Sequence, residues 1–244
     1  AVSIGIIGAA DGPTSIYVAN LFAGDLIGPI TVAAYSYMSL VPLIQPPVIR
    51  ALTTPEERRI GMDLTLCKVS KTTRILFPII VTAVAGLIAP MSVALIGSLM
   101  FGNLIRECGV LEKLSQAAQN ELSSLVTLLL GITIGSTMVA ENFLTIKTLM
   151  ILGMGLFAFV FDTAGGVLFA KLLNLFLPQK INPMIGAAGI SAFPMSARVI
   201  QKMAQKESPG NFILMQAVGA NVAGQVGSIL AGGVLIYLVS SMAF

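Results

Sequence analysis

Residues 75–105 read ILFPIIVTAVAGLIAPMSVALIGSLMFGNLI and contain no Asp, Glu, Lys or Arg. About 20 consecutive apolar residues are enough to cross the hydrocarbon core of a bilayer. This stretch therefore predicts either one long tilted span or, if it bends at Pro90, two short passes. Three further windows lack these four residue types, namely 26–49, 122–140 and 208–244. A fifth window, 148–170, carries a single charge at Asp162.

Composition supports a membrane protein. Of the 244 residues, 56% are hydrophobic and only 10% are charged, and the mean hydropathy is +0.92. Soluble domains carry about a quarter charged residues. A soluble core of this size cannot hide so much apolar surface, so we expect an all-α polytopic membrane protein.

Charge and residue usage exclude several classes of function. A net charge of only +3 does not indicate a nucleic-acid partner, since proteins that bind nucleic acid usually carry a strongly basic surface. The chain has no histidine, which excludes a His-based triad and a His-ligated metal. Its two cysteines, Cys67 and Cys108, have no spacing typical of a metal site or a disulfide framework. The chain begins without Met inside an apolar stretch, so we expect it to be a piece of a longer protein.

We expect a single membrane domain over residues 1–244 with about six spans and additional broken segments. The basic segment 50–74 is predicted to be cytoplasmic by the positive-inside rule, and it is also a candidate docking surface for a soluble partner. Residues 106–121 place apolar side chains at helical spacing, which predicts an amphipathic helix at the membrane interface. The remaining expected spans are 26–49 (ending near Pro46 and Pro47), 122–140, 147–177 and, last, about 210–242.

Two apolar segments, 1–22 and 181–197, are interrupted by glycine and proline, and such interruptions break a membrane helix. They also echo each other, because residues 7–15 read IGAADGPTS and residues 185–191 read IGAAGIS. Paired broken segments are typical of transporters with inverted repeats, where they surround an ion site at the membrane midplane. The alternative is two ordinary kinked helices whose similarity is fortuitous.

Asp11 is the leading candidate for ion binding. It is the only charged residue among the first 24 and lies at the predicted break. An unpaired carboxylate at that depth costs at least about 2.5 kcal/mol, so it calls for a cation or a proton. The hydroxyls of Thr14 and Ser15 and the freed backbone carbonyls add the oxygen ligands that a hard cation prefers. The alternative is an Asp that caps a turn at the membrane edge.

Other polar residues in apolar surroundings are secondary candidates. Arg198 is predicted either to clamp a carboxylate or to anchor the chain at the cytoplasmic face. Asp162 is assigned either to a proton path or to an interface. Uncharged donors that are candidates for ion ligation or helix contacts are Asn182, Ser191, Ser196, Asn221 and Gln225. Tyr35 and Tyr37 are candidate proton donors, or members of an aromatic belt at the membrane surface.

These residues and their order resemble the β subunits of the sodium-pumping biotin-dependent decarboxylases, which serve oxaloacetate, methylmalonyl-CoA, glutaconyl-CoA and malonate systems. The stretches that carry the resemblance are GIIGAADGPTSIY, GNLIRECGV, FDTAGGVLFAKLLN and NPMIGAAGISAFPMSARV. They extend across the whole chain. The resemblance covers roughly the C-terminal three-fifths of a family chain.

The resemblance implies an enzyme in a bacterial or archaeal cytoplasmic membrane. Such a subunit decarboxylates carboxybiotin held by a biotin carrier protein, consumes a proton and exports Na⁺. Its implied partners are that carrier, a carboxyltransferase subunit, a small membrane-anchoring subunit and further copies of itself. The alternative from the residues alone is a Na⁺-coupled secondary transporter without decarboxylase activity. A purely structural anchor would leave the polar residues in the broken segments unexplained.

The resemblance also assigns roles to particular residues. The implied Na⁺ ligands are Asp11, Asn182 and Asn221. The implied catalytic residues are Tyr37, Ser191 and Arg198, and the implied contacts to carboxybiotin are Arg198 and Gly186. We expect Arg198 to orient the carboxybiotin, and Tyr37 or Ser191 to relay the proton.

Overall fold

A computed structural model describes residues 2–62, 69–137 and 145–242, and every regular element within these ranges is helical. Six helices in these ranges are long and apolar enough to cross a membrane. The prediction of an all-α polytopic membrane protein is therefore confirmed. The six are Gly24–Leu52, Lys71–Ile88, Pro90–Cys108, Glu112–Ser136, Ile146–Phe176 and Leu214–Ser241.

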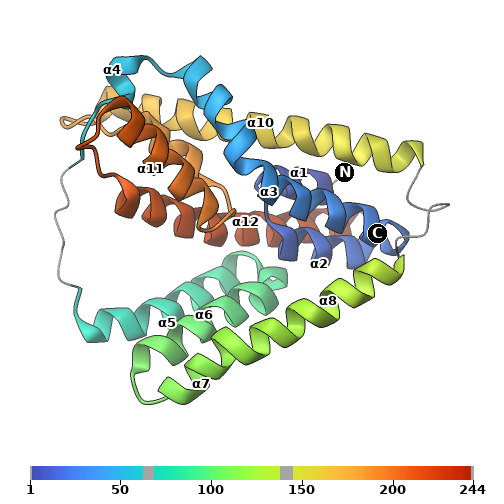
Figure 1. The fold of residues 1–244 in the computed structure, drawn as a ribbon. Helices are drawn as coiled ribbons and strands as arrows, with labels where there is room; N and C mark the ends of the chain where they lie inside the picture. Colours follow the sequence, from blue (N-terminus) through green and yellow to red (C-terminus); the bar gives the residue numbers. More distant parts are fainter. Residues whose placement is uncertain (1, 63–68, 138–144, 243–244) are drawn as a thin grey trace. The chain divides into compact units, whose positions relative to one another are not determined.

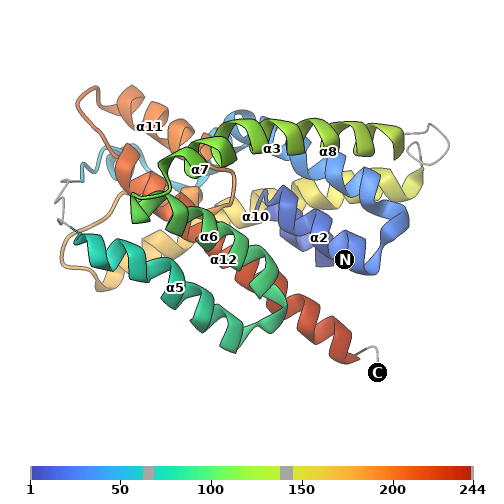
Figure 2. The same ribbon diagram turned by 90° about the horizontal axis from the view of Figure 1, so that it is seen from below.

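The chain forms two compact units, residues 1–65 with 144–228 and residues 66–143 with 229–244. In the first unit, α3 and α10 pack on each other and against α1, and α2 packs along α3 (Figures 1 and 2). The described helices of this unit are α1 (Val2–Gly8), α2 (Gly12–Phe22), η1 (Gly24–Leu26), α3 (Ile27–Leu52), α4 (Pro55–Arg58), α10 (Ile146–Phe176), η4 (Pro183–Gly189), α11 (Met195–Glu207) and the first half of α12 (Leu214–Met242).

The first predicted break is present between α1 and α2. Ala10 has a left-handed φ of 53°, which ends α1, and Asp11 then caps the N-terminus of α2 by accepting a hydrogen bond from Thr14 N at 3.1 Å. Pro13 occupies the first turn of α2, where its missing N–H has no helical partner to lose. The sequence Ala-Asp-Gly-Pro therefore ends one helix and starts the next within three residues.

The second predicted break is present as well, in a different form. Asn182 caps η4, a 3-10 helix, and residues 190–194 connect it to the start of α11 at Met195. The Phe193–Pro194 peptide is cis. Because a 3-10 helix replaces an α-helix on one side of this break, the two breaks are alike in sequence more than in local structure, and the inverted repeat stays a prediction.

Helix α3 is longer than expected. It was predicted to end near Pro46 and Pro47, but it continues to Leu52 with three prolines inside it. Proline removes one helical hydrogen bond and clashes with the preceding turn, so other contacts must hold this part of the helix. The packing of α3 against α11 and η4 supplies them, and in membrane proteins neighbouring helices commonly re-satisfy such backbone groups.

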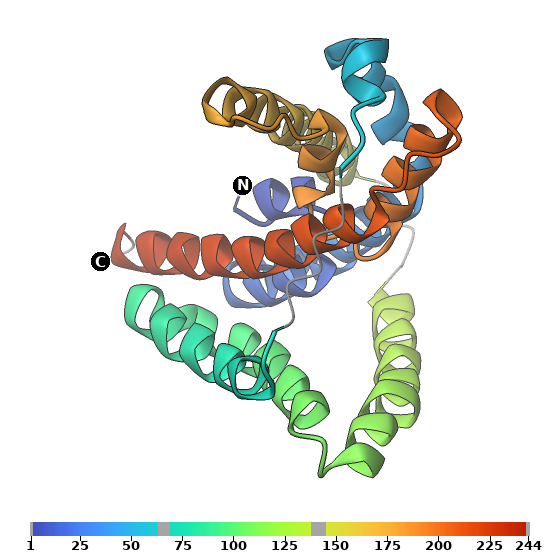
Figure 3. The ribbon, with the colours of Figure 1, turned by 90° about the vertical axis from the view of Figure 1, so that its left-hand side faces the viewer.

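In the second unit, the apolar stretch 75–105 forms two helices rather than one. Helix α5 (Lys71–Ile88) ends at Ala89, η2 (Pro90–Ser92) turns the chain, and α6 (Val93–Cys108) returns beside α5 (Figure 3). An 18-residue helix is about 27 Å long, which nearly spans the hydrocarbon core. The two-pass interpretation of this stretch is therefore the correct one.

The amphipathic helix predicted over 106–121 does not exist as a separate element. Helix α6 runs to Cys108 and is ended by Gly109, whose left-handed φ of 74° favours glycine. Helix α7 (Glu112–Ala117) then continues through a π-helical turn, η3 (Ala118–Leu122), directly into α8 (Ser123–Thr137). The sequence from 112 to 130 contains neither glycine nor proline, so nothing interrupts the helix where the predicted boundary was placed. The predicted ends at residues 138–140, and Lys68 of the basic segment, lie outside the described residues.

Candidate functional site

The two breaks meet inside the first unit. The backbone N–H of Ser191, in the second break, donates to the carbonyl of Ala9, in the first, at 2.7 Å. Helix α12 crosses at the same place, because the amide of Asn221 donates to the carbonyl of Ile190 at 2.5 Å. Gly224, one turn further, lies so close to the Gly189 carbonyl that a side chain there would overlap it. Non-helical backbone from two segments is thus held against one continuous helix.

Asp11 lies at this meeting point and is 4% exposed. Its carboxylate accepts hydrogen bonds from Thr14 N at 3.1 Å, from Thr14 Oγ1 at 2.8 Å and from Ser228 Oγ of α12 at 2.5 Å. The ion pairs of the described residues do not include it. A buried carboxylate that is hydrogen-bonded but not paired is short of positive charge, so the site favours a cation.

Helix α12 carries side-chain oxygen atoms of the kind that bind a hard cation. The side-chain oxygen of Asn221 is buried and has no hydrogen-bond partner among the described residues, while its nitrogen is held by Ile190. Buried polar atoms are nearly always paired, so this oxygen, like those of Thr163, Asn211 and Gln216, is free to accept a further partner. Asn221 and Ser228 are seven residues apart, about 10 Å along α12. Carboxylate, amide and hydroxyl oxygens are the ligands that hard cations prefer, and the residues present therefore fit Na⁺.

Asn182 lies elsewhere in the same unit. Its nitrogen donates to the carbonyls of Arg58 and Ile60 at 3.0 and 2.9 Å, and its oxygen accepts from Met184 N at 3.1 Å. The loop that it holds also receives the amide of Gln216 at Met62, and Gln216 is about 18 Å from Ser228 along α12. The structure therefore shows Asn182 bound to the 58–62 loop and Asn221 bound to Ile190 of the second break. Among the described residues, the partner of Asp11 on α12 is Ser228.

The predicted catalytic tyrosine, Tyr37, is buried between α3 and α10. Its hydroxyl donates to the carbonyl of Leu152, and its ring stacks on Phe159 with centroids 6.4 Å apart. Tyr35 is placed differently, because the backbone of Gly12, next to Asp11, lies against its ring. Of the two tyrosines, Tyr35 is thus the one beside the first break.

Two other predicted residues belong to the second break. Ser191 is 6% exposed and forms the backbone link to Ala9. Gly186 lies in η4, where its backbone touches that of Gly166 on α10 so closely that a side chain on either residue would overlap the other. Both positions hold the second break in place, Ser191 against the first break and Gly186 against α10.

Arg198 is exposed on α11 and lines a cavity of about 370 Å³ between α3 and α11. Four cationic side chains line this cavity, from Arg50, Arg198, Lys202 and Lys206. None of the four takes part in an ion pair among the described residues. The nearby acid Glu207 pairs instead with Arg58 at 2.8 Å. A cavity with four unpaired cations is suited to an anionic ligand.

A buried polar link joins this cavity to the second break. Ser196, two residues before Arg198, donates to Gln45 Oε1 at 3.0 Å and to the carbonyl of Ala187 at 3.1 Å. Gln45 Nε2 donates to the same carbonyl at 2.9 Å, and both side chains are fully buried. Helix α3, η4 and the first turn of α11 therefore share one hydrogen-bonded cluster.

Two residues of the site were not predicted from the sequence. They are Ser228 and Gln45, and neither is among the candidate site residues named above. For Gln45 a signal was available, because it is the only amide in the uncharged window 26–49. Ser228 offers no comparable signal, since its role depends on the crossing of α12 over the first break.

Comparison with known proteins identifies the family of this chain. The family model described as Na⁺-transporting oxaloacetate decarboxylase beta subunit matches residues 1–239. The chain is 53% identical over 238 residues to methylmalonyl-CoA decarboxylase subunit beta of Propionigenium modestum, covering 98% of this chain and 60% of that protein. It is 52% identical over 236 residues to the probable oxaloacetate decarboxylase beta chain of Vibrio cholerae, covering 97% of this chain and 54% of that protein.

A further relative is methylmalonyl-CoA decarboxylase subunit beta of Veillonella parvula, 52% identical over 241 residues, which are 99% of this chain and 64% of that protein. The chain thus spans a little more than half the length of the curated relatives that it matches. The match nevertheless extends over nearly every residue present, including both breaks and α12. The chain belongs to the family of the Na⁺-transporting oxaloacetate decarboxylase β subunits.

Proposed function

We propose that this chain is the part of a membrane subunit that decarboxylates carboxybiotin on a partner carrier protein and couples that reaction to Na⁺ transport. The observation that carries the proposal is Asp11, a buried carboxylate at the point where two broken segments and α12 meet. It has no ion-pair partner among the described residues. Broken helices supply ion ligands in many transporters. Family membership supports the decarboxylase part of the proposal, since the relatives are named as decarboxylase subunits.

Na⁺ is the transported substrate in this proposal. Asp11 supplies the negative charge, Asn221 supplies its unpaired oxygen, and Ser228 orients the carboxylate by its hydrogen bond. Asn182, which the family resemblance also assigns to Na⁺, has all the hydrogen bonds of its amide directed at the 58–62 loop and at Met184. We therefore assign Asn182 a positioning role, in which it holds the start of η4.

Carboxybiotin is proposed to bind at the basic cavity of α3 and α11. Its carboxylate would lie against the guanidinium of Arg198, a group that binds carboxylates in a bidentate manner. In the reaction the bond from the ureido nitrogen to the carboxyl carbon breaks, CO₂ leaves, and the nitrogen takes up one proton. A site that excludes water favours this loss of charge from the carboxylate. Tyr37 and Ser191 remain the proposed proton relay, and Gly186 remains a proposed contact near biotin.

The buried cluster of Gln45, Ser196 and the Ala187 carbonyl supports coupling between the two sites. One of its members lies two residues from Arg198, and another lies three residues before Ile190, whose carbonyl holds Asn221. A rigid hydrogen-bonded link of this kind can pass a displacement of α11 to the second break. Release of CO₂ at the cavity would then alter the oxygen ligands around Asp11.

The acyl substrate of the complete complex is proposed to be chosen by a separate carboxyltransferase subunit. The relatives carry names for two substrates, oxaloacetate and methylmalonyl-CoA, at nearly the same identity to this chain. Overall similarity to this chain thus does not separate the two substrates. We propose as further partners the biotin carrier protein, a small membrane-anchoring subunit and additional copies of this subunit.

The test uses the full-length subunit reconstituted in vesicles, with free carboxybiotin and with or without Na⁺. We expect Na⁺-dependent release of CO₂, which Asp11→Asn abolishes and the exposed control Asp25→Asn leaves intact. Asparagine caps a helix as well as aspartate does, so this variant removes charge without removing the cap of α2. We expect Arg198→Gln to raise the KM for carboxybiotin, whereas Lys180→Gln, an exposed cation away from the cavity, does not.

Two results would overturn the proposal. Full Na⁺-dependent turnover by Asp11→Asn would show that the Asp11 carboxylate is not needed at the ion site. Na⁺ uptake without any decarboxylation, in vesicles that respond equally with and without avidin, would establish a secondary transporter instead. Avidin separates the two because it sequesters biotin and leaves a transporter untouched.

A further inference from the structure

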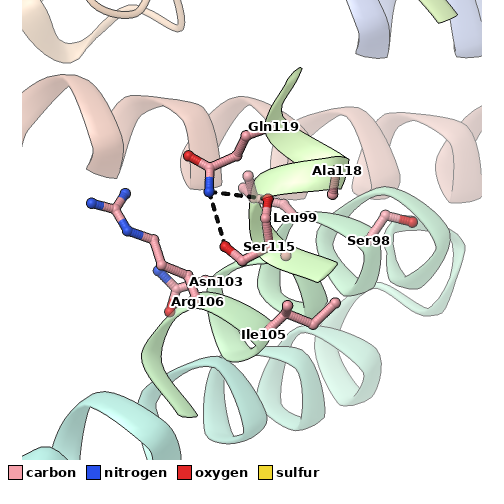
Figure 4. A pocket seen from close by; sticks show the side chains of 9 residues that line it. Ser98, Leu99, Asn103, Ile105, Arg106, Ser115, Ala118 and Gln119 are labelled. Atoms are coloured by element: carbon pink, nitrogen blue, oxygen red, sulfur yellow. Dashed lines mark hydrogen bonds between the residues drawn. The ribbon is translucent and has the colours of Figure 1, made fainter. Parts of the chain in front are cut away.

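A second polar cavity lies in the other unit of the chain, between α6 and the helix formed by α7 and η3. Its volume is about 410 Å³ (Figure 4). The polar side chains that line it are those of Ser98, Asn103, Arg106, Ser115 and Gln119. None of these residues is used by the proposed decarboxylation or by the Na⁺ site.

Arg106 brings an uncompensated positive charge to this cavity. It is exposed, and no ion pair among the described residues includes it. The adjacent acid, Glu107, pairs with Arg74 at 3.3 Å, and Glu112 accepts a hydrogen bond from Gln116 at 2.9 Å. Within the part of the chain that the structure describes, no acidic side chain lines the cavity. The cavity therefore attracts an anion.

Hydrogen-bond donors accompany this charge. Gln119 Nε2 donates to Ser115 Oγ at 2.9 Å and to Ser115 O at 3.2 Å (Figure 4). Because Ser115 Oγ accepts this bond, its own proton is left to donate to a ligand. The amide of Asn103, one turn before Arg106 on α6, lines the same space and forms no hydrogen bond with the described residues. Ser115 itself is 4% exposed, so its hydroxyl is held in a fixed position.

The cavity opens beside apolar helix surface at the basic end of α5 and α6. Lys71 and Arg74 begin α5, and Arg106 ends α6. Basic residues at the ends of membrane helices commonly contact anionic lipid headgroups. The exposed apolar side chains of the helices that form the cavity include Leu99, Phe101, Leu114 and Leu122. A ligand with a phosphate group and acyl chains would match both surfaces.

We propose that this cavity binds a phosphate group through Arg106, Asn103 and Ser115. The phosphate could belong to an anionic lipid headgroup or to a free phosphate, since both present the same oxyanion. The guanidinium would contact two phosphate oxygens in a bidentate manner, and the amide and hydroxyl would bind a third. The apolar surface beside the cavity favours the lipid as the source.

The test measures thermal stabilisation of the full-length subunit in detergent on addition of phosphatidylglycerol, phosphatidylcholine or inorganic phosphate. We expect stabilisation by phosphatidylglycerol, with a half-saturating concentration about tenfold higher for Arg106→Gln, because a charge-assisted hydrogen bond is lost. Lys113→Gln is the matched control, since Lys113 is an exposed cation on α7 that does not line the cavity. Asn103→Ala, a second exposed position, should weaken binding in the same direction.

The lipid and phosphate arms identify the source of the phosphate group. Stabilisation by phosphatidylglycerol but not by inorganic phosphate assigns the cavity to a lipid headgroup, and stabilisation by both assigns it to the phosphate alone. An equal loss in Arg106→Gln and Lys113→Gln would show general attraction to the basic surface and overturn the proposal. So would an Arg106→Gln protein that responds to phosphatidylglycerol as the unmodified subunit does.

Discussion

Replacing Ser228 by alanine should weaken Na⁺ binding without disturbing the fold. The Ser228 hydroxyl, on α12, donates to Asp11 Oδ2 at 2.5 Å. Thr14 Oγ1 donates to the same oxygen, and Thr14 N donates to Oδ1. Alanine keeps the helix, because it has the best helix propensity, and it removes only the oxygen. The carboxylate stays buried and capped by Thr14 but loses the contact that fixes it toward α12.

The size of the effect follows from the type of bond. A hydrogen bond to a charged group contributes about 1.5–3 kcal/mol, and each 1.4 kcal/mol changes an affinity about tenfold. Water can take part of the place of the lost hydroxyl, because Ser228 is only partly buried. The lower end of the range therefore applies, which predicts about a tenfold rise in the Na⁺ concentration that gives half-maximal decarboxylation.

The assay is the Na⁺ dependence of carboxybiotin decarboxylation by the reconstituted full-length subunit. Ser241→Ala is the matched control, since Ser241 lies on the same helix, is exposed and donates only to the carbonyl of Leu238. We expect a shifted Na⁺ curve with a similar maximal rate for Ser228→Ala and an unchanged curve for the control. An unshifted curve for Ser228→Ala, in protein that melts at the normal temperature, would refute the assignment of Ser228 to the ion site.

Two further predictions concern stability. Gly186→Ala should lower the free energy of unfolding by about 1–3 kcal/mol, because the added methyl group overlaps the backbone of α10. The control Gly189→Ala adds a Cβ that meets no atom within 4 Å, so it should melt close to the parent temperature. Equal melting temperatures of the two variants would contradict the close contact at Gly186. Glu57 lies outside the spans, and burial raises its pKa, but hydrogen bonds from the backbone N–H of Thr54 and from Lys171 outweigh burial and leave the pKa below its ordinary 4.5. A group with a lowered pKa stabilises the fold at pH values above its ordinary pKa, and this contribution is lost as pH falls through the lowered pKa. Between pH 6 and pH 3 the melting temperature should therefore fall more steeply for the parent than for Glu57→Gln. Parallel curves of melting temperature against pH would contradict the role of Glu57.

The spans could be predicted from the sequence because crossing a bilayer is a requirement on each segment separately. A run of about 20 uncharged residues satisfies it wherever the run occurs. Helix ends were harder to predict, since they depend on packing. Helix α3 continues through Pro46 and Pro47 because α11 and η4 support it, and α7 joins α8 because no local signal ends it.

The candidate site was predicted in part. Asp11 and Asn221 were identified because a charge or an amide in an apolar segment is costly wherever it lies. Their partners, Ser228 for Asp11 and Ile190 for Asn221, depend on which segments cross. Ser228 and Gln45 were missed for the same reason, because each gains its role from a partner more than 140 residues away along the chain.

The sequence by itself determined that this protein lies in a membrane, that its first and penultimate apolar segments are broken, and that Asp11 places a charge in an apolar segment. Each of these conclusions rests on a local cost, of exposing apolar surface, of placing proline in a helix or of burying a charge. Only the tertiary structure decided that the two breaks touch through Ser191 and Ala9 and that α12 closes the site with Asn221 and Ser228. Contacts between distant segments are fixed by the packing of whole helices, and the close approach of Gly224 to Gly189 shows how little space that packing leaves.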